Sequence, residues 1–336
     1  MNKFIELITK HRNLSPITIN NYNRGLNNLQ KNTGIENHSE FITKWRDIIK
    51  YIMDAPTKQP YKLNILNFYI VALDSYIKEE LLEFGVAPGD ITGGLAECRK
   101  HQFKIKEDLD ILKYNETKSE KESTNWVGFE ELEKCVKTNF KLVRKIIKSP
   151  NSDAKAIHKI HLWLISALYA CGKENPPLRL DFTNMRIVQH SHYEKMTEKT
   201  HNYLVVVNQR TKYFVLNEYK TFKKYGTKTI KICSKLNTVI NKYIKIKKEN
   251  GIQTDLLLFN NKNEPLSESL LSGYIGEAFN NTGKKITANL IRHIFITDVA
   301  LQLPLAERNV IANRMCHNLG QQLQYNKIHS YSSDED

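Results

Sequence analysis

The sequence predicts a mainly helical protein with a small antiparallel β-sheet, which is an α+β fold. Three observations predict it. Apolar residues recur at helical spacing over residues 1–113, a polar segment follows at 114–124, and short alternating runs separated by turns lie between residues 184 and 233. With 336 residues the chain is long enough for two domains. We therefore expect a helical N-terminal domain at 1–113, a linker at 114–124 and a mixed domain at 125–336.

The N-terminal domain is expected to consist of helices joined by short turns. Ser15 can cap a helix that has Pro16 at its first position, and Gly34 is suited to end it. The remaining elements are helices over about residues 39–53 and 61–80, a turn-rich segment at 84–94, and a helix that ends near Tyr114.

The linker contains one aromatic residue and no aliphatic residue, so it contributes little to a core. After it, an apolar helix is expected at 155–171. The runs NMRIV, YLVVVN, KYFVLNEY and TKTIKIC then alternate as strands of an antiparallel sheet do, and helices return from about Asn237.

The charge balance indicates a polyanionic partner. Lys and Arg number 50 against 36 Asp and Glu, which gives a formal net charge of +14. Ten lysines lie from Lys220 to Lys248, a stretch that has no acidic residue and is interleaved with aromatic and aliphatic side chains. Folded lysines of this kind can follow a phosphate backbone, so nucleic acid is the first candidate and an anionic membrane surface the second.

Several other classes of protein find no support in the sequence. There is no apolar run of about 18 residues, so no membrane span is expected. The five cysteines are scattered without a CxxC pair, which argues against a disulfide framework or a zinc site and favours a reducing, intracellular setting. No glycine-rich phosphate-binding motif occurs, so no nucleotide cofactor is expected.

Four separate segments carry residues suited to chemistry on a phosphate. They hold, in chain order, Arg179 in NPPLRLDF, Lys220 in NEYKT, Asn289 and Arg292 in ITANLIRH, and His317 in MCH with Tyr325 eight residues later. Taken singly, each has a simpler structural explanation, such as an ion pair, a surface lysine or a buried ring. Their order along the chain gives them weight as a set.

In this order the sequence resembles the tyrosine recombinase (phage integrase) family over about residues 125–330. That family has an Arg after an apolar helix, a Lys on a β-hairpin, a His-x-x-Arg motif, a His after Gly, and a nucleophilic Tyr. The PPLRLDF segment is similar in style to recombinases of large DNA viruses, virophages and related mobile elements. The resemblance implies a helical DNA-gripping domain, a mixed catalytic domain, double-stranded DNA with specific recombination sites as partner, and four protomers acting together.

The resemblance also implies a role for the residues at the phosphate. Tyr325 would form a 3′-phosphotyrosyl bond, which conserves the phosphodiester energy, so religation needs no ATP. Arg179, Arg292 and His317 would stabilise the negative charge that develops on the phosphate oxygens. No cofactor and no metal is implied.

Four lysines of the stretch from Lys220 to Lys248 are expected to have one of two roles. Lys220 would act as the general acid that protonates the departing 5′ oxygen, because a neighbouring positive charge lowers the pKa of an amine. Lys223, Lys224 and Lys228 would contact the DNA backbone.

The sequence departs from the family pattern in two places. Asn289 stands where the family has the His of His-x-x-Arg, which leaves open the group that accepts the Tyr325 proton. Cys316 stands where the family has a Gly before the His that corresponds to His317. This replacement is tolerable only if the backbone at position 316 does not need a positive φ. His293 would point about 100° away from the preceding residue on a helix, and we interpret it as structural.

Alternatives remain for two residues and for the function. Lys173 competes with Arg179 as the first cation, and Tyr331 competes with Tyr325 as the nucleophile. The same residues would serve a type IB topoisomerase that relaxes supercoiled DNA, and a catalytically inactive DNA-binding protein could retain the fold.

Overall fold

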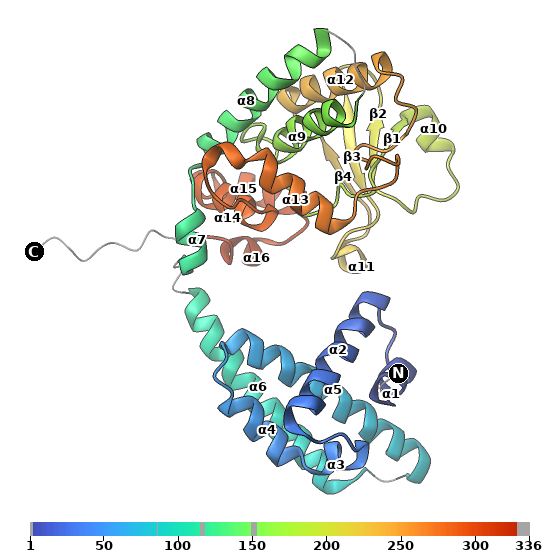
Figure 1. Ribbon diagram of the computed structural model, residues 1–336, viewed down its shortest axis with the longest axis vertical. Coiled ribbons are helices and arrows are strands. Elements are labelled where there is room, and N and C mark those ends of the chain that lie inside the picture. The colour runs from blue at the N-terminus through green and yellow to red at the C-terminus, as the bar shows by residue number, and fades with distance from the viewer. Residues whose placement is uncertain (1–2, 86, 115–117, 149–152, 328–336) are drawn as a thin grey trace, which may run out of the picture. The chain divides into compact units, whose positions relative to one another are not determined.

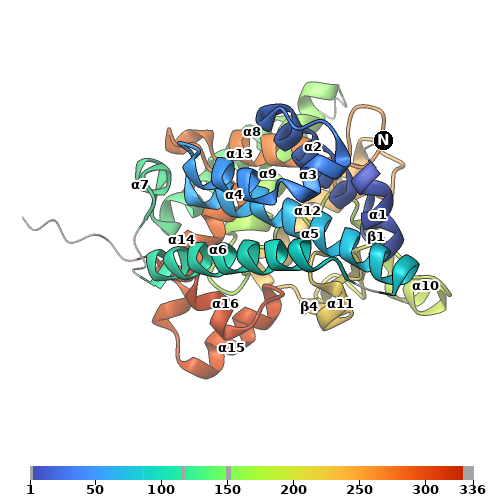
Figure 2. The same cartoon turned by 90° about the horizontal axis from the view of Figure 1, so that it is seen from below.

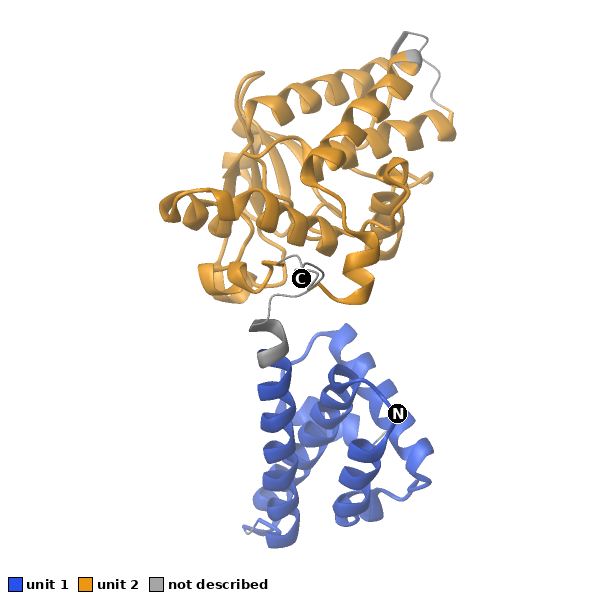
Figure 3. Cartoon of the chain, turned by 90° about the vertical axis from the view of Figure 1, so that its left-hand side faces the viewer, with its two compact units in different colours: residues 1–115 blue, residues 116–336 orange. Residues whose placement is uncertain are grey.

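The computed structural model describes residues 3–85, 87–114, 118–148 and 153–327 of the chain. The chain divides into two compact units, Met1–Asn115 and Glu116–Asp336, which Figure 3 colours separately. The described residues of the first unit are helices and their connections, whereas the second unit combines helices with a four-stranded sheet. None of the described helices is both long and apolar enough to span a membrane.

The helices of the first unit are α1 (Lys3–His11), α2 (Pro16–Thr33), α3 (His38–Thr43), α4 (Trp45–Asp54), α5 (Gln59–Phe84) and α6 (Gly89–Tyr114), as labelled in Figure 1. The predicted ends of α2 are confirmed. The Ser15 side chain accepts a hydrogen bond from the Thr18 amide, Pro16 takes the first position, and Gly34 closes the helix with a φ of 69°.

This unit differs from the sequence prediction in two details. The helix expected over 39–53 is divided at Lys44, whose ψ of 33° ends α3 and begins α4. The segment 84–94 is a turn only in its first half, because α6 already begins at Gly89. Packing explains a glycine inside that helix, since a Cβ on Gly94 would lie 2.7 Å from the Trp45 ring. α5 and α6 run side by side (Figure 2).

The helices of the second unit are α7 (Glu120–Asn125), α8 (Phe129–Lys148), α9 (Ala154–Ala170), α10 (His190–Lys195), α11 (Phe222–Tyr225), α12 (Ser234–Glu249), α13 (Glu268–Ala278), α14 (Ala288–Asp298), α15 (Leu305–Arg314) and α16 (Leu319–Leu323). α7 occupies part of the segment 114–124 that the sequence analysis interprets as a linker. It forms there because Ser119 and Glu122 make a capping box that satisfies the amides at its start.

The sheet is mixed, which corrects the prediction of an antiparallel sheet. Its strands are β1 (Arg186–Gln189), β2 (Tyr203–Val206), β3 (Lys212–Leu216) and β4 (Lys228–Lys231), in that order. β1 and β2 are parallel, and the other pairs are antiparallel. The chain between β1 and β2 passes through α10 and returns in the same direction, as a parallel pair requires. Side-chain alternation predicts which residues share a face but not the direction of a strand.

The two faces of the sheet pack differently. Leu204, Phe214 and Ile230 are in register across β2, β3 and β4 and face the main core of this unit. The alternate residues Tyr203 and Val215 belong to a small cluster that also contains Tyr193 of α10. The main core is built on α9, which packs against α8, α12, α13 and α14 (Figure 1). The fold prediction of a mainly helical chain with a small sheet is confirmed.

Candidate active site

Arg179 lies in the loop that follows α9. Tyr169, on the buried last turn of α9, donates its hydroxyl to the Arg179 carbonyl. The Arg179 amide donates to a carboxylate oxygen of Asp181 at 3.0 Å, and the Asn202 side chain donates to the Asp181 carbonyl at 2.9 Å. The backbone that carries Arg179 is therefore held on both sides.

Arg292 is a buried cation on α14, with 1% of its surface exposed. Its Nη1 donates to the Pro177 carbonyl at 2.7 Å and its Nη2 to the Met315 carbonyl at 3.4 Å. Burial lowers the pKa of this guanidinium, and the Tyr325 hydroxyl beside it acts in the opposite direction. Its Nε is buried and has no hydrogen-bond partner in the described part of the chain. A charged donor at this depth is suited to an anionic ligand.

A tight turn after α15 directs His317 toward the same place. The His317 amide donates to the Ala312 carbonyl at 3.1 Å, and Cys316 has a φ of 60°. This is the pattern of a Schellman cap, whose left-handed position glycine adopts at least cost. A residue other than glycine was expected to be tolerable at position 316 only if the backbone there had no positive φ, and this condition is not met. Cys316 therefore adopts, with a side chain, the left-handed conformation that glycine favours.

His317 is buried and has one free ring nitrogen. Its Nδ1 lies 3.1 Å from the Asn318 carbonyl, which can only accept, so the neutral ring carries its proton on Nδ1 and a lone pair on Nε2. That Nε2 is buried and has no hydrogen-bond partner among the described residues. Burial, together with the charges of Arg292 and Arg179, lowers the pKa of His317 to about 4. At neutral pH the site therefore contains an uncharged imidazole with an available acceptor.

Tyr325 follows α16 and brings these groups together. Its ring stacks on that of His317 at 5.6 Å between centroids with 16° between the planes, and lies 4.7 Å from that of His293. The Arg292 guanidinium lies 5.3 Å from the ring centroid. The charges of Arg292 and Arg179 both act on the tyrosine hydroxyl. Side chains from three separate segments thus converge on one phenol.

The electrostatics favour the ionised form of that phenol. Burial alone would raise the pKa of Tyr325, but the charges of Arg292 and Arg179 and their hydrogen bonds outweigh it. The pKa of Tyr325 is therefore lower than the ordinary value of 10.0. A tyrosine activated by two arginines is a competent nucleophile for an electrophilic centre bound by the same arginines.

The turn between β3 and β4 supplies amines near this group. Lys220 is exposed, and the side chain of the next residue, Thr221, donates to the Cys316 carbonyl at 3.2 Å. Lys228, the first residue of β4, is half-buried. Burial raises the pKa of the Cys316 thiol, and the charge of Lys228 is among those that oppose this rise. Lys228 is therefore a second candidate for the role that the sequence analysis gave to Lys220.

The other residues that the sequence predicts for the site are exposed or lie outside the described residues. Lys223 and Lys224 are exposed on α11. Asn289 is exposed on the first turn of α14 and lines a hollow of about 260 Å³ together with residues of α7. Lys173 is exposed in the turn after α9. The alternative nucleophile, Tyr331, lies outside the described residues.

Two further residues organise the site: Asn202, which sequence reasoning missed, and His293, which it interpreted as structural. Asn202 is buried, and its Oδ1 accepts from the amides of Asn217 and Glu218 at 2.9 and 2.8 Å, so it joins the Arg179 loop to the Lys220 turn. No motif marks it. His293 donates from Nδ1 to the Tyr325 carbonyl at 2.9 Å. Its place beside Arg292 in the sequence was the available signal.

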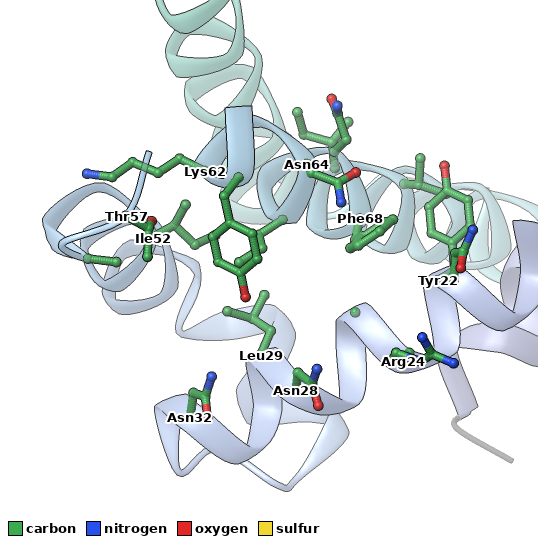
Figure 4. A pocket seen from close by; sticks show the side chains of 18 of the residues that line it. Tyr22, Arg24, Asn28, Leu29, Asn32, Ile52, Thr57, Lys62, Asn64 and Phe68 are labelled. Carbon is green, nitrogen blue, oxygen red and sulfur yellow. The ribbon is translucent and has the colours of Figure 1, made fainter. Parts of the chain in front are cut away.

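A separate polar hollow of about 780 Å³ lies in the first unit between α2 and α5 (Figure 4). Amides dominate its polar lining, and they come from Asn21, Asn28, Asn32, Asn64, Asn67 and Gln102. Arg24 and Lys62 add positive charge, and no carboxylate lines the hollow among the described residues. It holds none of the groups that converge on Tyr325.

Comparison with known proteins identifies the fold. No protein-family profile and no curated protein sequence matches the chain. Among solved structures, a lambda integrase (75–356) dimer bound to a COC′ core site is 12% identical, with a TM-score of 0.51 over all of this chain and 96% of that one. A second lambda integrase dimer bound to a COC′ core site is 13% identical, with a TM-score of 0.51 over all of this chain and 79% of that one. XerH site-specific recombinase bound to difH substrate is 15% identical, covering 97% and 81% of the two chains with a TM-score of 0.49. The chain has the fold of the tyrosine recombinases.

Proposed function

We propose that this protein is a site-specific DNA recombinase or integrase that cuts and rejoins strands through Tyr325. One observation carries the proposal. The phenol of Tyr325 has a pKa that the charges of two arginines lower, and Arg292 Nε and His317 Nε2 are buried with no hydrogen-bond partner among the described residues. Unpaired buried polar atoms are costly; a phosphate bound there would accept from Arg292 Nε, and His317 Nε2 would be satisfied by the proton it takes from the phenol.

The chemistry assigned to these groups balances. The Tyr325 oxygen forms a bond to phosphorus as the bond from phosphorus to the 5′ oxygen breaks. His317 Nε2 accepts the phenol proton, and the resulting N–H then donates to a phosphate oxygen. Arg179 and Arg292 stabilise the charge on the other oxygens, and an amine from the β3–β4 turn gives a proton to the 5′ oxygen. In this proposal His317, and not Asn289, takes the phenol proton.

The proposed partner is double-stranded DNA. The net charge of +14 and the exposed lysines of α11 favour the phosphate backbone. The asparagines of the hollow between α2 and α5 carry paired donors and acceptors of the type that read adenine edges. Four protomers on two recombination sites would allow reciprocal exchange, and paired repeats beside the gene would indicate a mobile element or an integrated viral genome.

Covalent capture tests the proposal without knowledge of the target. A pool of nicked duplexes with a random core is incubated with the protein, and the duplexes that become covalently bound are sequenced. A selected duplex should give a protein–DNA adduct through the 3′ phosphate. Tyr325→Phe should bind the same duplex without forming the adduct. An adduct that persists in Tyr325→Phe, or a pool from which the unaltered protein binds duplexes but captures none covalently, would overturn it. Relaxation of supercoiled plasmid by the monomer would instead indicate a type IB topoisomerase.

A further inference from the structure

The backbone around Tyr325 is held by contacts that take no part in the chemistry proposed above. His293 Nδ1 lies 2.9 Å from the Tyr325 carbonyl oxygen, which can only accept, so His293 donates from Nδ1. Two residues later the Lys327 amide donates to Thr297 Oγ1 at 3.1 Å. Both partners are on α14, one turn apart, so this helix fixes the segment on each side of Asn326.

A second element reaches the same segment from the other direction. Glu122 of α7 places one carboxylate oxygen 3.7 Å from His293 Nε2 and the other 3.7 Å from Lys327 Nζ. The three side chains are largely buried, with 20%, 12% and 14% of their surfaces exposed for Glu122, His293 and Lys327. Burial lowers the pKa of His293, so its ring is neutral at pH 7, and the pair that carries charge is Glu122 with Lys327. Charged groups this far from water interact more strongly than a surface ion pair.

Glu122 is itself held rigidly. Its carboxylate accepts from the Ser119 amide at 2.9 Å and from the Ser119 hydroxyl at 2.7 Å, which is the capping box that begins α7. A carboxylate fixed by its own helix can fix what it contacts. α7 is also the first described helix after the boundary between the two units, so it stands at the entry of the chain into the second unit.

We propose that His293 and Glu122 form a latch that positions the nucleophile, so that the path of the chain at α7 sets the placement of the Tyr325 phenol. His293 acts on the backbone carbonyl of Tyr325, and Glu122 acts on the same segment through the charge of Lys327. Both are positioning residues, because neither contacts the reacting atoms. The inference rests on the proposed function only for its consequence in catalysis, and the contacts themselves can be tested in the free protein.

His293→Leu and His293→Asn form the central pair of variants. Leucine fills the space but cannot donate, whereas the Asn Nδ2 can take the place of His Nδ1. Displacement of a reacting group by about 1 Å costs on the order of 100-fold in rate. We expect His293→Leu to slow single-turnover adduct formation on a captured duplex by roughly 10- to 100-fold. His293→Asn should recover most of that rate, and duplex affinity should be equal in the two variants.

Glu122→Gln and Ser119→Ala form the matched pair on α7. Gln retains the ability to cap but loses the charge, whereas Ser119→Ala weakens the cap and leaves the contacts to His293 and Lys327 in place. Glu122→Gln should therefore slow adduct formation more than Ser119→Ala does.

Hydrogen exchange of the free protein, followed at the Lys327 amide, separates this inference from the proposed function. His293→Leu and Glu122→Gln should exchange faster there than the unaltered protein, and Ser119→Ala should show a smaller increase. If no variant changes exchange or rate, or if His293→Asn is as impaired as His293→Leu, the latch is wrong although Tyr325 still cleaves. If the unaltered protein forms no adduct, the proposed function fails, and exchange still decides whether the latch exists.

Discussion

Arg292 donates through Nη1 to the carbonyl of Pro177 at 2.7 Å, two residues before Arg179. The second cation of the site therefore holds the loop that carries the first. The two guanidiniums are separated by 113 positions in the chain, from 292 − 179, yet one carbonyl sets their relation. This contact gives Arg292 a structural role beside the catalytic role that we propose for it.

Arg292→Lys should separate these two parts. A lysine amine keeps the charge but cannot donate to Pro177 and to a phosphate in a fixed fork. We expect adduct formation to fall on the order of 10²- to 10³-fold. The unpaired carbonyls of Pro177 and Met315 should cost about 1–3 kcal/mol in the free energy of unfolding. Urea unfolding and single-turnover capture measure the two effects, and an unchanged capture rate would contradict the assignment of Arg292.

The general acid can be identified by changing the leaving group. A duplex with sulfur in place of the bridging 5′ oxygen has a leaving group that needs no proton, so only the loss of the general acid is rescued by it. We expect Lys228→Ala to be slow on the oxygen duplex, on the order of 10²- to 10⁴-fold, and fast on the sulfur duplex. Lys220→Ala should slow cleavage of the oxygen duplex and of the sulfur duplex by the same factor. If the sulfur duplex rescues Lys220→Ala and not Lys228→Ala, Lys220 is the general acid.

The sequence predicts some elements well because their cause is local. The Ser15 cap and the Gly34 stop of α2 depend on residues adjacent in the chain. The parallel pairing of β1 and β2 depends on the path of the chain between them, which alternation does not encode. α7 was missed because its capping box begins a helix that has no buried residue of its own.

In the candidate site, too, some features could be predicted from the sequence and others depend on the fold. Residue order alone singled out Arg179, Arg292, His317 and Tyr325, because the family resemblance depends on order. The tautomer of His317 could not be predicted, since it depends on a carbonyl that the fold brings to Nδ1. The contact of His293 with the Tyr325 carbonyl likewise exists only once α14 and the segment after α16 meet. The chemical roles of these residues are predictions that covalent capture of nicked duplexes tests.

Stability should depend on pH through His317. Its pKa is about 4 in the folded chain and 6.5 when unperturbed, so the unfolded state binds more protons between these values. The contribution of His317 is therefore complete above about pH 6.5 and is lost as pH falls toward 4, by up to about 3 kcal/mol. Urea unfolding at pH 4.5 and 7.5 should show a smaller pH-dependent loss in His317→Asn than in the unaltered protein. Equal losses would mean that His317 is solvated.

The left-handed backbone at Cys316 should reverse the usual ranking of alanine and glycine. At an ordinary helical position glycine is less stable than alanine by about 1 kcal/mol. At a φ of 60° the Cβ of any other residue costs about 1–2 kcal/mol. We therefore expect Cys316→Gly to unfold at a higher urea concentration than Cys316→Ala, by about 1 kcal/mol. Both lose the buried sulfur, so the comparison isolates the backbone. Cys316→Val should be the least stable of the three, because a β-branched side chain crowds this conformation most. If alanine is the more stable of the first pair, Cys316 is not left-handed in solution, and the turn that directs His317 to Tyr325 must be different.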